Sequence, residues 1–156
     1  MRREEQLVKN TQLALDDVCR AAIAVPADKR TWSPGGAARS TLDQMREVAA
    51  SADWLLAILE SGKAPDPHRH GESDHGAPEL GTVEECIEAA RTNTPRLCQL
   101  IASYPADKLE NEIVMPFSGA TTMTMADVMG LHYWNLVYHL GQINQIQLIL
   151  GDRVMH

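Results

Sequence analysis

The stretch His132-Tyr-Trp-Asn-Leu-Val-Tyr-His139-Leu-Gly-Gln-Ile143 decides the fold of this chain. At about 100° per residue it predicts part of one long helix over about residues 125–150. One face of this helix mixes Leu and Ile with imidazole and carboxamide groups, so we expect it to point at a core. An unpaired buried polar group costs on the order of 1–3 kcal/mol, so these groups must pair, line a pocket or hold a metal. The face consists of His132, Asn135, Leu136, His139, Gln142, Ile143, Ile146 and Leu150.

Three earlier segments also carry apolar residues at helical spacing. They cover about residues 4–25, 40–62 and 82–103. Asp43 is placed for a capping box at the start of the second segment. Pro95 lies inside the third segment and is expected to kink or interrupt that helix, because proline lacks the N–H that a helical hydrogen bond needs.

The connections between these segments are long. Residues 62–80 are rich in Gly, Pro, His and Asp, which predicts a crossover that runs the length of a bundle. Residues 104–124 contain two short runs, beginning at Ile113 and Thr121, that are able to pair as a hairpin. We therefore predict an all-α protein in which residues 1–156 form one four-helix bundle with long crossover connections. The crossover also carries a His-rich run, expected to collect metal only adventitiously: His68, His70 and His75.

The composition argues against several kinds of partner. The 156 residues carry a formal net charge of −7 without a visible basic patch, which disfavours nucleic acid and anionic membrane surfaces. The sequence contains neither a secretory leader nor about 18 consecutive apolar residues. Cys19, Cys86 and Cys98 lie in helical segments without metal-ligand spacing, as reduced packing thiols do. We therefore expect a cytoplasmic protein that binds neither nucleic acid nor membranes.

The predicted last helix is apolar on a second side as well. Trp134, Val137, Tyr138, Gly141 and Leu148 lie roughly opposite the histidine face. A helix that is apolar all round is buried on both sides. This second side packs either against the chain's own long connections or against a second copy, and we expect a homodimer through this helix.

Two polar residues of the histidine face are spaced to share a ligand. Asn135 and His139 are roughly 6 Å apart at positions i and i+4, the spacing by which one helix presents two ligands to a metal. His132 lies about 10.5 Å away from His139 along the axis and is expected to lie one layer from the site. A third donor has to come from another helix, where Glu47 lies beside Gln44 at the edge of an apolar face.

The residues themselves leave three functions open for this cluster. Glu47, Asn135 and His139 would make an oxygen-rich site for a divalent metal, although a carboxamide is a poor ligand for zinc, nickel or copper. Alternatively, the polar groups satisfy one another as a hydrogen-bonded core. A third possibility is a pocket for an organic ligand without a metal. The residues in support of the site would be His132, Gln142 and Gln44.

Two stretches of the sequence resemble a known family. The stretch Trp134-Asn-Leu-Val-Tyr-His139-Leu-Gly-Gln-Ile-Asn-Gln-Ile-Gln-Leu-Ile-Leu-Gly151-Asp resembles the last helix of the DinB/YfiT-like superfamily, whose members carry a His-x-x-x-His-x-Gly-Gln-Ile type motif there. The stretch Trp32-Ser-Pro-Gly-Gly-Ala-Ala-Arg-Ser-Thr-Leu-Asp43 resembles the start of that family's second helix. The resemblance implies a DinB-like four-helix bundle, often dimeric, with a divalent-metal site.

The resemblance also implies which positions would hold the metal. The family ligands are three histidines, one from the second helix and two from the fourth. His139 matches the second ligand of the fourth helix, and Asn135 stands where the first would be. Glu47 or Val48 stands where the second-helix ligand would be. Because two of the three positions carry other residues, we expect a degenerate metal site for Zn²⁺, Ni²⁺ or Mn²⁺.

Characterised relatives of this kind include thiol-dependent S-transferases and isomerases that use low-molecular-weight thiols such as bacillithiol or mycothiol. In such a mechanism the metal binds the thiol sulfur and favours the nucleophilic thiolate. The resemblance therefore implies a metal-dependent, or formerly metal-dependent, enzyme of the thiol-transferase type that acts on an unidentified small molecule. The alternative is a non-catalytic helical bundle that binds a small ligand or a protein partner without metal.

Overall fold

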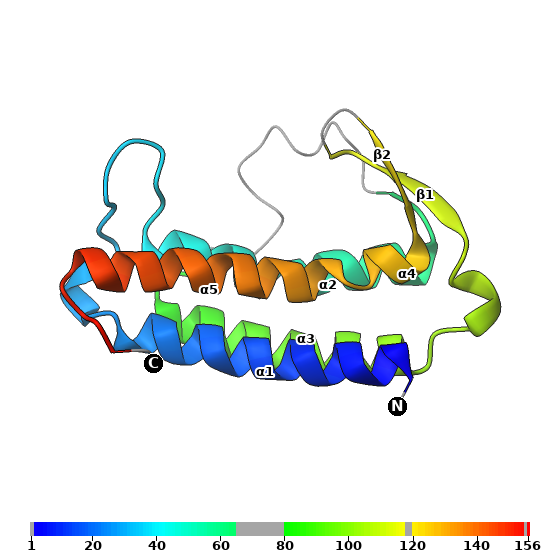
Figure 1. The fold of residues 1–156 in the computed structure, drawn as a ribbon, viewed down its shortest axis with the longest axis horizontal. Helices are drawn as coiled ribbons and strands as arrows, with labels where there is room; N and C mark the ends of the chain where they lie inside the picture. The colour runs from blue at the N-terminus through cyan, green and yellow to red at the C-terminus, as the bar shows by residue number, and fades with distance from the viewer. Residues whose placement is uncertain (1, 65–79, 118–119, 155) are drawn as a thin grey trace.

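The computed structural model describes residues 2–64, 80–117, 120–154 and 156, and these form a bundle of four long helices (Figure 1). The predicted all-α architecture is confirmed. The long helices are α1 (Arg3–Ala24), α2 (Thr41–Ser61), α3 (Val83–Ala102) and α5 (Leu131–Ile149). The short elements are η1 (Ala27–Lys29), η3 (Ala106–Lys108), β1 (Glu112–Met115), β2 (Thr121–Thr124) and α4 (Met125–Val128).

Local sequence signals set the ends of these helices. The Ser40 hydroxyl accepts a 3.1 Å hydrogen bond from the backbone N–H of Asp43, which forms the predicted capping box of α2. Gly62 follows α2 with a φ of 64°, a left-handed conformation that glycine adopts without a Cβ clash. Thr82 and Glu85 form the same kind of capping box at the start of α3.

The helices lie in two layers, α2 with α5 and α1 with α3 (Figure 1). Each helix of one layer also contacts a helix of the other, α2 against α3 and α1 against α5. Leu42 and Val83, from the first turns of α2 and α3, belong to the same core cluster, so these two helices run parallel. The connection over residues 62–82 therefore joins opposite ends of the bundle, and its residues 65–79 lie outside the described residues.

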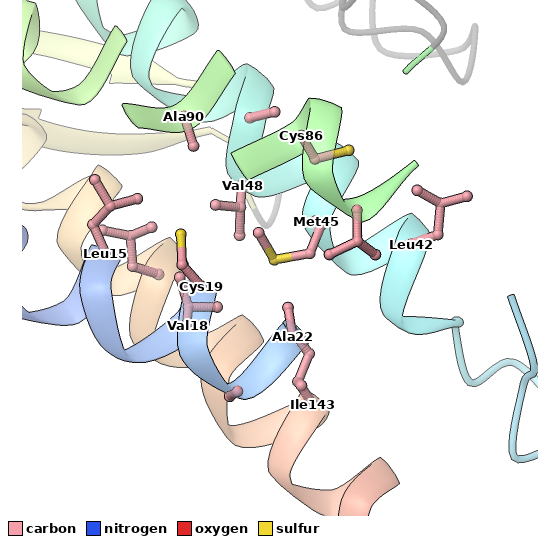
Figure 2. Close-up of a cluster of buried hydrophobic side chains, with 14 of the residues drawn as sticks. Leu15, Val18, Cys19, Ala22, Leu42, Met45, Val48, Cys86, Ala90 and Ile143 are labelled. Atoms are coloured by element: carbon pink, nitrogen blue, oxygen red, sulfur yellow. The ribbon is translucent and has the colours of Figure 1, made fainter. Parts of the chain in front are cut away.

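The core divides into two apolar clusters along the bundle. Val18 of α1, Met45 of α2 and Ile143 of α5 are fully buried in the first cluster, at the end where α2 begins (Figure 2). Leu55 and Leu97 are fully buried in the second cluster, at the opposite end. Burying one such side chain contributes roughly 1.5–3 kcal/mol, so these clusters fix the relative positions of the four helices.

The predicted inward face of the last helix is confirmed. His132, Leu136, His139 and Ile143 of α5 are all buried. Gln147, which was not assigned to this face, is buried too and donates a 2.8 Å hydrogen bond to the carbonyl oxygen of Ala21 on α1. No helix among the described residues, α5 included, combines the length and apolarity needed to cross a membrane.

The prediction of one continuous helix over residues 125–150 is wrong, because α4 and α5 are separate. The N–H of Gly130 donates to the carbonyl oxygen of Asp127 at 3.0 Å, which ends α4 in a tight turn. A Cβ at position 130 would lie 3.3 Å from that oxygen, so glycine permits the turn. Glycine is also a weak helix former, which favours a break at this position.

Two other expectations have different outcomes. A kink or an interruption was expected at Pro95, and the interruption does not occur, since α3 continues through this residue. Thr94 and Leu97 on either side of Pro95 are fully buried, and this packing holds the helix together despite the missing N–H. The hairpin is confirmed, since β1 and β2 pair antiparallel with Ile113 opposite Met123.

The three cysteines are buried and free, as predicted. Burial raises the pKa of the Cys86 and Cys98 thiols to about 11, and it raises the pKa of Cys19 as well. Because the thiolate is the reactive form, these residues pack in the core and are not poised as nucleophiles.

Candidate functional site

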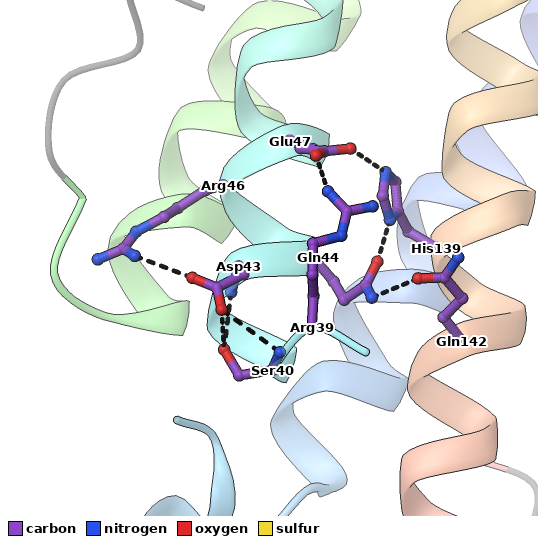
Figure 3. Close-up of polar contacts among 8 residues, drawn as sticks. All are labelled: Arg39, Ser40, Asp43, Gln44, Arg46, Glu47, His139 and Gln142. Carbon is purple, nitrogen blue, oxygen red and sulfur yellow. Dashed lines mark hydrogen bonds and ion pairs between the residues drawn. The ribbon is translucent and has the colours of Figure 1, made fainter. Parts of the chain in front are cut away.

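The centre of the candidate site is the imidazole of His139, which α5 turns into the bundle without exposed surface. Its Nδ1 pairs with Oε1 of Gln44 on α2, and Nε2 of Gln44 donates to Oε1 of Gln142 on α5 (Figure 3). A chain of three polar side chains therefore joins the two helices. Because an amide oxygen only accepts hydrogen bonds, Nδ1 of His139 carries the proton.

This tautomer leaves a lone pair on Nε2 of His139. Nε2 lies 3.0 Å from Oε2 of Glu47, yet within the described part of the chain it has no partner with hydrogen-bond geometry. Burial, assisted by the charge of Arg39, lowers the pKa of His139 to about 4, so the ring is neutral near pH 7. A lone pair thus faces a carboxylate oxygen, an arrangement that a cation between them would stabilise.

Asn135 presents a second unsatisfied acceptor. It lies one turn before His139 on α5, and its Oδ1 is buried without a hydrogen-bond partner among the described residues. Asn135 and Glu47 line the same pocket. Leaving such an oxygen unpaired costs about 1–3 kcal/mol, so an ion or a hydrogen-bond donor bound here would remove that cost.

Arg39 belongs to this site although sequence reasoning did not single it out. It lies directly before the first residue of the α2 capping box, and its guanidinium pairs with Oε1 of Glu47 (Figure 3). The Arg39 and Glu47 side chains are 36% and 33% exposed, so the pair lies at the rim of the bundle. Hydrophobic periodicity identifies helix faces only, and Arg39 lies in a connection whose path appears only in the folded chain.

His132 has a different environment from His139. Its Nδ1 lies 2.7 Å from Oγ of Ser51 on α2, and its Nε2 lies 3.0 Å from Oγ1 of Thr94 on α3. Both ring nitrogens are therefore paired, and burial lowers the pKa of His132 to about 4. His132 joins three helices through hydrogen bonds and also forms part of the pocket wall.

An apolar pocket of about 720 Å³ adjoins the site. Glu47, Ser51 and Trp54 line it from α2 at positions i, i+4 and i+7, a pattern from which this wall could have been predicted. Phe117, which follows β1, and Met123 of β2 close the pocket from the hairpin side, and no helical pattern indicates them. The Phe117 ring lies 6.2 Å from that of Trp54, centroid to centroid.

The structure thus brings Glu47, Gln44, Gln142 and His139 together between α2 and α5, with Asn135 on the adjoining wall. Within the described ranges no group of three or more His, Cys, Asp or Glu side chains could hold a metal ion. A metal site at His139 would therefore have to use the Asn135 amide as well as Glu47. The His-rich run lies outside the described residues: His68, His70 and His75.

The second apolar side of α5 faces outward. The exposed fractions of Trp134 and Leu148 are 62% and 56%, and Val137 and Tyr138 are exposed beside them. The rings of Trp134 and Tyr138 stack with their centroids 5.2 Å apart. The connections in the described part of the chain therefore leave an apolar strip of α5 uncovered.

Comparisons with known proteins agree with this fold. The sequence model of the DinB superfamily matches residues 10–143. The structure of YfiT from Bacillus subtilis, described as a probable metal-dependent hydrolase with an unusual four-helix bundle topology, superposes with a TM-score of 0.75 at 10% identity, over 97% of this chain and 91% of that chain. A DinB-like protein from Bacillus subtilis gives a TM-score of 0.70 at 15% identity, over 97% of this chain and 96% of its own. At these identities the two structures establish a shared fold alone. No curated protein matches the sequence.

Proposed function

Because the chain belongs to the DinB superfamily, we propose that it is a metal-dependent enzyme in which Glu47, Asn135 and His139 hold a divalent ion. The observation that carries the proposal is the 3.0 Å approach of His139 Nε2 to Glu47 Oε2 without a hydrogen bond. Two donors that each bind one ion at about 2.1 Å, at right angles, lie about 3 Å apart. The observed separation fits two ligands of one ion.

The surroundings of His139 suit a metal ligand. A ligating imidazole ordinarily donates its other N–H to a neighbouring acceptor, which sets its tautomer and its orientation. Gln44 supplies that acceptor, and Gln142 holds Gln44 in place. With two oxygen donors and one nitrogen, the set matches Mn²⁺ by ligand type, while Zn²⁺ and Ni²⁺ compete through their preference for imidazole.

A bound divalent ion supplies positive charge that lowers the pKa of a coordinated thiol or water. The chain's own side chains would bind and orient the second reactant. Trp54, Phe117 and Met123 line the pocket with apolar surface, while Glu47 and Asn135 place polar atoms in its wall. A pocket of this kind favours a small, mostly apolar substrate with one polar end.

For the reaction we propose that a low-molecular-weight thiol displaces a leaving group from an electrophilic carbon of the substrate, as the resemblance to thiol-dependent S-transferases implies. A C–S bond forms while the bond to the leaving group breaks, and the thiol proton is released with the leaving group. Hydrolysis is the second candidate, and the description of YfiT as a probable metal-dependent hydrolase favours it. The two reactions differ in the nucleophile, a thiol or a water molecule. Incubating the metal-loaded protein with an apolar electrophile, with and without a small thiol, separates the two reactions. A thioether product supports transfer. Hydrolysis of the electrophile at the same rate with and without the thiol supports the second candidate.

A non-catalytic bundle that binds a small ligand or a protein partner without metal is the alternative. The Arg39–Glu47 ion pair favours this alternative, because the guanidinium already compensates the carboxylate. The two proposals predict different metal contents for the protein, so measuring the bound metal decides between them.

The deciding experiment is metal analysis of protein purified without an affinity tag and incubated with Mn²⁺, Zn²⁺ or Ni²⁺. We expect one ion per chain in the wild type and none in Glu47→Gln, which keeps the shape of the side chain and removes its charge. An absence of bound ion in the wild type would support the non-catalytic bundle.

We further propose that the protein works in the cytoplasm as a homodimer through the outer side of α5. Burying Trp134, Tyr138 and Leu148 against a second copy would remove exposed apolar surface from water. Trp134 also belongs to the pocket wall, so the second copy would cover part of the pocket. Light scattering after size exclusion should give a dimer for the wild type and a monomer for Trp134→Glu.

A further inference from the structure

Arg39 is bound to the one carboxylate that the proposed metal site contains. Its guanidinium contacts Oε1 of Glu47, while Oε2 of the same carboxylate lies 3.0 Å from Nε2 of His139 (Figure 3). Arg39 therefore contacts the same carboxylate that would bind the ion.

We propose that Arg39 is a built-in competitor of the divalent ion: its guanidinium holds Glu47 in the metal-free protein and lowers the affinity for metal. This inference rests on the proposed metal site, and it adds a role for a residue outside the ligand set. Arg39 thereby determines how much free metal the protein needs before the site fills.

The charges explain the competition. Without metal, the positive charge of Arg39 compensates the negative charge of Glu47. With a divalent ion bound, the same carboxylate would face the two positive charges of the ion and the one of Arg39. Like charges repel more strongly at a partly buried site than in bulk water, so Arg39 has to leave Glu47 or weaken the binding of the ion.

The geometry allows Arg39 to leave without disturbing the helix. Its side chain is 36% exposed, so the guanidinium can rotate toward solvent. The next residue, Ser40, stays in place because its hydroxyl and backbone are both bound to Asp43. Release of Glu47 therefore requires a change of side-chain rotamer and no unwinding of α2.

Arg46 of α2 offers a matched control. It carries the same charge, but its guanidinium binds Asp43 at 3.1 Å and the carbonyl oxygen of Leu80 at 2.8 Å, on the side of α2 away from His139 (Figure 3). Arg39→Gln and Arg46→Gln thus each remove one positive charge, but only Arg39→Gln removes the charge that pairs with Glu47.

The test is calorimetric titration of chelator-stripped protein with MnCl₂. We expect Arg39→Gln to bind Mn²⁺ about tenfold more tightly than the wild type, and Arg46→Gln to stay within about twofold. Thermal melting supplies a second measurement: saturating Mn²⁺ should raise the melting temperature of Arg39→Gln more than that of the wild type.

The outcomes separate this inference from the proposed function. If the wild type binds one Mn²⁺ per chain and Arg39→Gln binds Mn²⁺ no more tightly than the wild type, the proposed competition is wrong and the proposed metal site is supported. An equal gain in affinity in Arg46→Gln would also overturn it, because the effect would then be one of net charge. If neither the wild type nor Arg39→Gln binds Mn²⁺ or melts differently in its presence, the metal site and the competition both fail.

Discussion

Two histidines of α5 are equally buried and have opposite surroundings. His132 lies between two hydroxyl groups, those of Ser51 and Thr94, which can each donate or accept, so both of its nitrogens are satisfied. His139 lies between an amide oxygen and a carboxylate, which both only accept hydrogen bonds. Its second nitrogen therefore has no hydrogen-bond partner among the described residues. Burial of a histidine therefore does not by itself indicate a site, whereas the chemistry around its second nitrogen does.

The largest expected difference between the two histidines is in metal binding. His139→Ala should lower the affinity for Mn²⁺ more than about 100-fold, beyond the loss typical for residues that only support a ligand. His132→Ala should retain one ion per chain, because its nitrogens already have protein partners. Calorimetric titration, with circular dichroism to verify folding, measures both. Equal losses in the two variants would contradict the distinction.

The next difference is in stability. His132→Ala removes the partner of two hydroxyl groups, one of them the fully buried Thr94, and leaves a cavity. We expect the free energy of unfolding to fall by about 2 kcal/mol, measured by urea denaturation in the presence of a chelator. Ser51→Ala removes the contacts of one hydroxyl, with His132 Nδ1 and with the carbonyl oxygen of Val48, and should cost about 1 kcal/mol. A cost for His132→Ala no larger than that of Ser51→Ala would show that the pairing of His132 matters little.

A third prediction concerns pH. Burial lowers the pKa of His132 from 6.5 to about 4, so the folded protein favours the neutral ring. The stabilisation is complete above pH 6.5 and is lost as the pH falls toward 4, because only the unfolded chain binds the proton in that interval. One such group lowers the free energy of unfolding by up to about 1.4 kcal/mol per pH unit there. Metal-free His132→Gln should show a shallower decline than the wild type in urea denaturation near pH 5, and an unchanged decline would contradict the assignment.

The smallest effect is expected from the groups that orient His139. Gln44→Leu removes the acceptor of the Nδ1 proton and should weaken Mn²⁺ binding about tenfold. Gln142→Leu acts one step further away, through Gln44, and should weaken binding less. The same titration measures both. A larger effect from Gln142 than from Gln44 would mean that the hydrogen-bond chain does not orient His139.

Much of the fold could be predicted because its signals are local. The capping box of Ser40 and Asp43 and the glycine after α2 mark helix ends within a few residues. The break at Gly130 was missed because its apolar neighbours continue the helical pattern on both sides. At Pro95 a kink or an interruption was expected, and the helix is not interrupted because burial of neighbouring side chains outweighs a local propensity.

The candidate site could be predicted only in part. The i, i+4 spacing places Asn135 and His139 on one helix face. Glu47 was the candidate from another helix because it lies beside Gln44 at the edge of an apolar face. The spacing does not reveal that Arg39 shares the carboxylate, or that Phe117 and Met123 close the pocket. Arg39 and Phe117 lie in connections and Met123 lies in a strand of four residues, so no helical pattern relates their positions in the chain to direction in space.

The sequence by itself determined the four long helices, most of their ends and the inward face of the last one, because hydrophobic spacing and capping act over a few residues. The tertiary structure alone decided the partners of the two histidines: Ser51 and Thr94 for one, Gln44 and Glu47 for the other. The physical reason is that these contacts join residues on different helices that lie between 38 and 95 positions apart in the chain. Their geometry follows from how the helices pack, which a pattern within one helix does not specify.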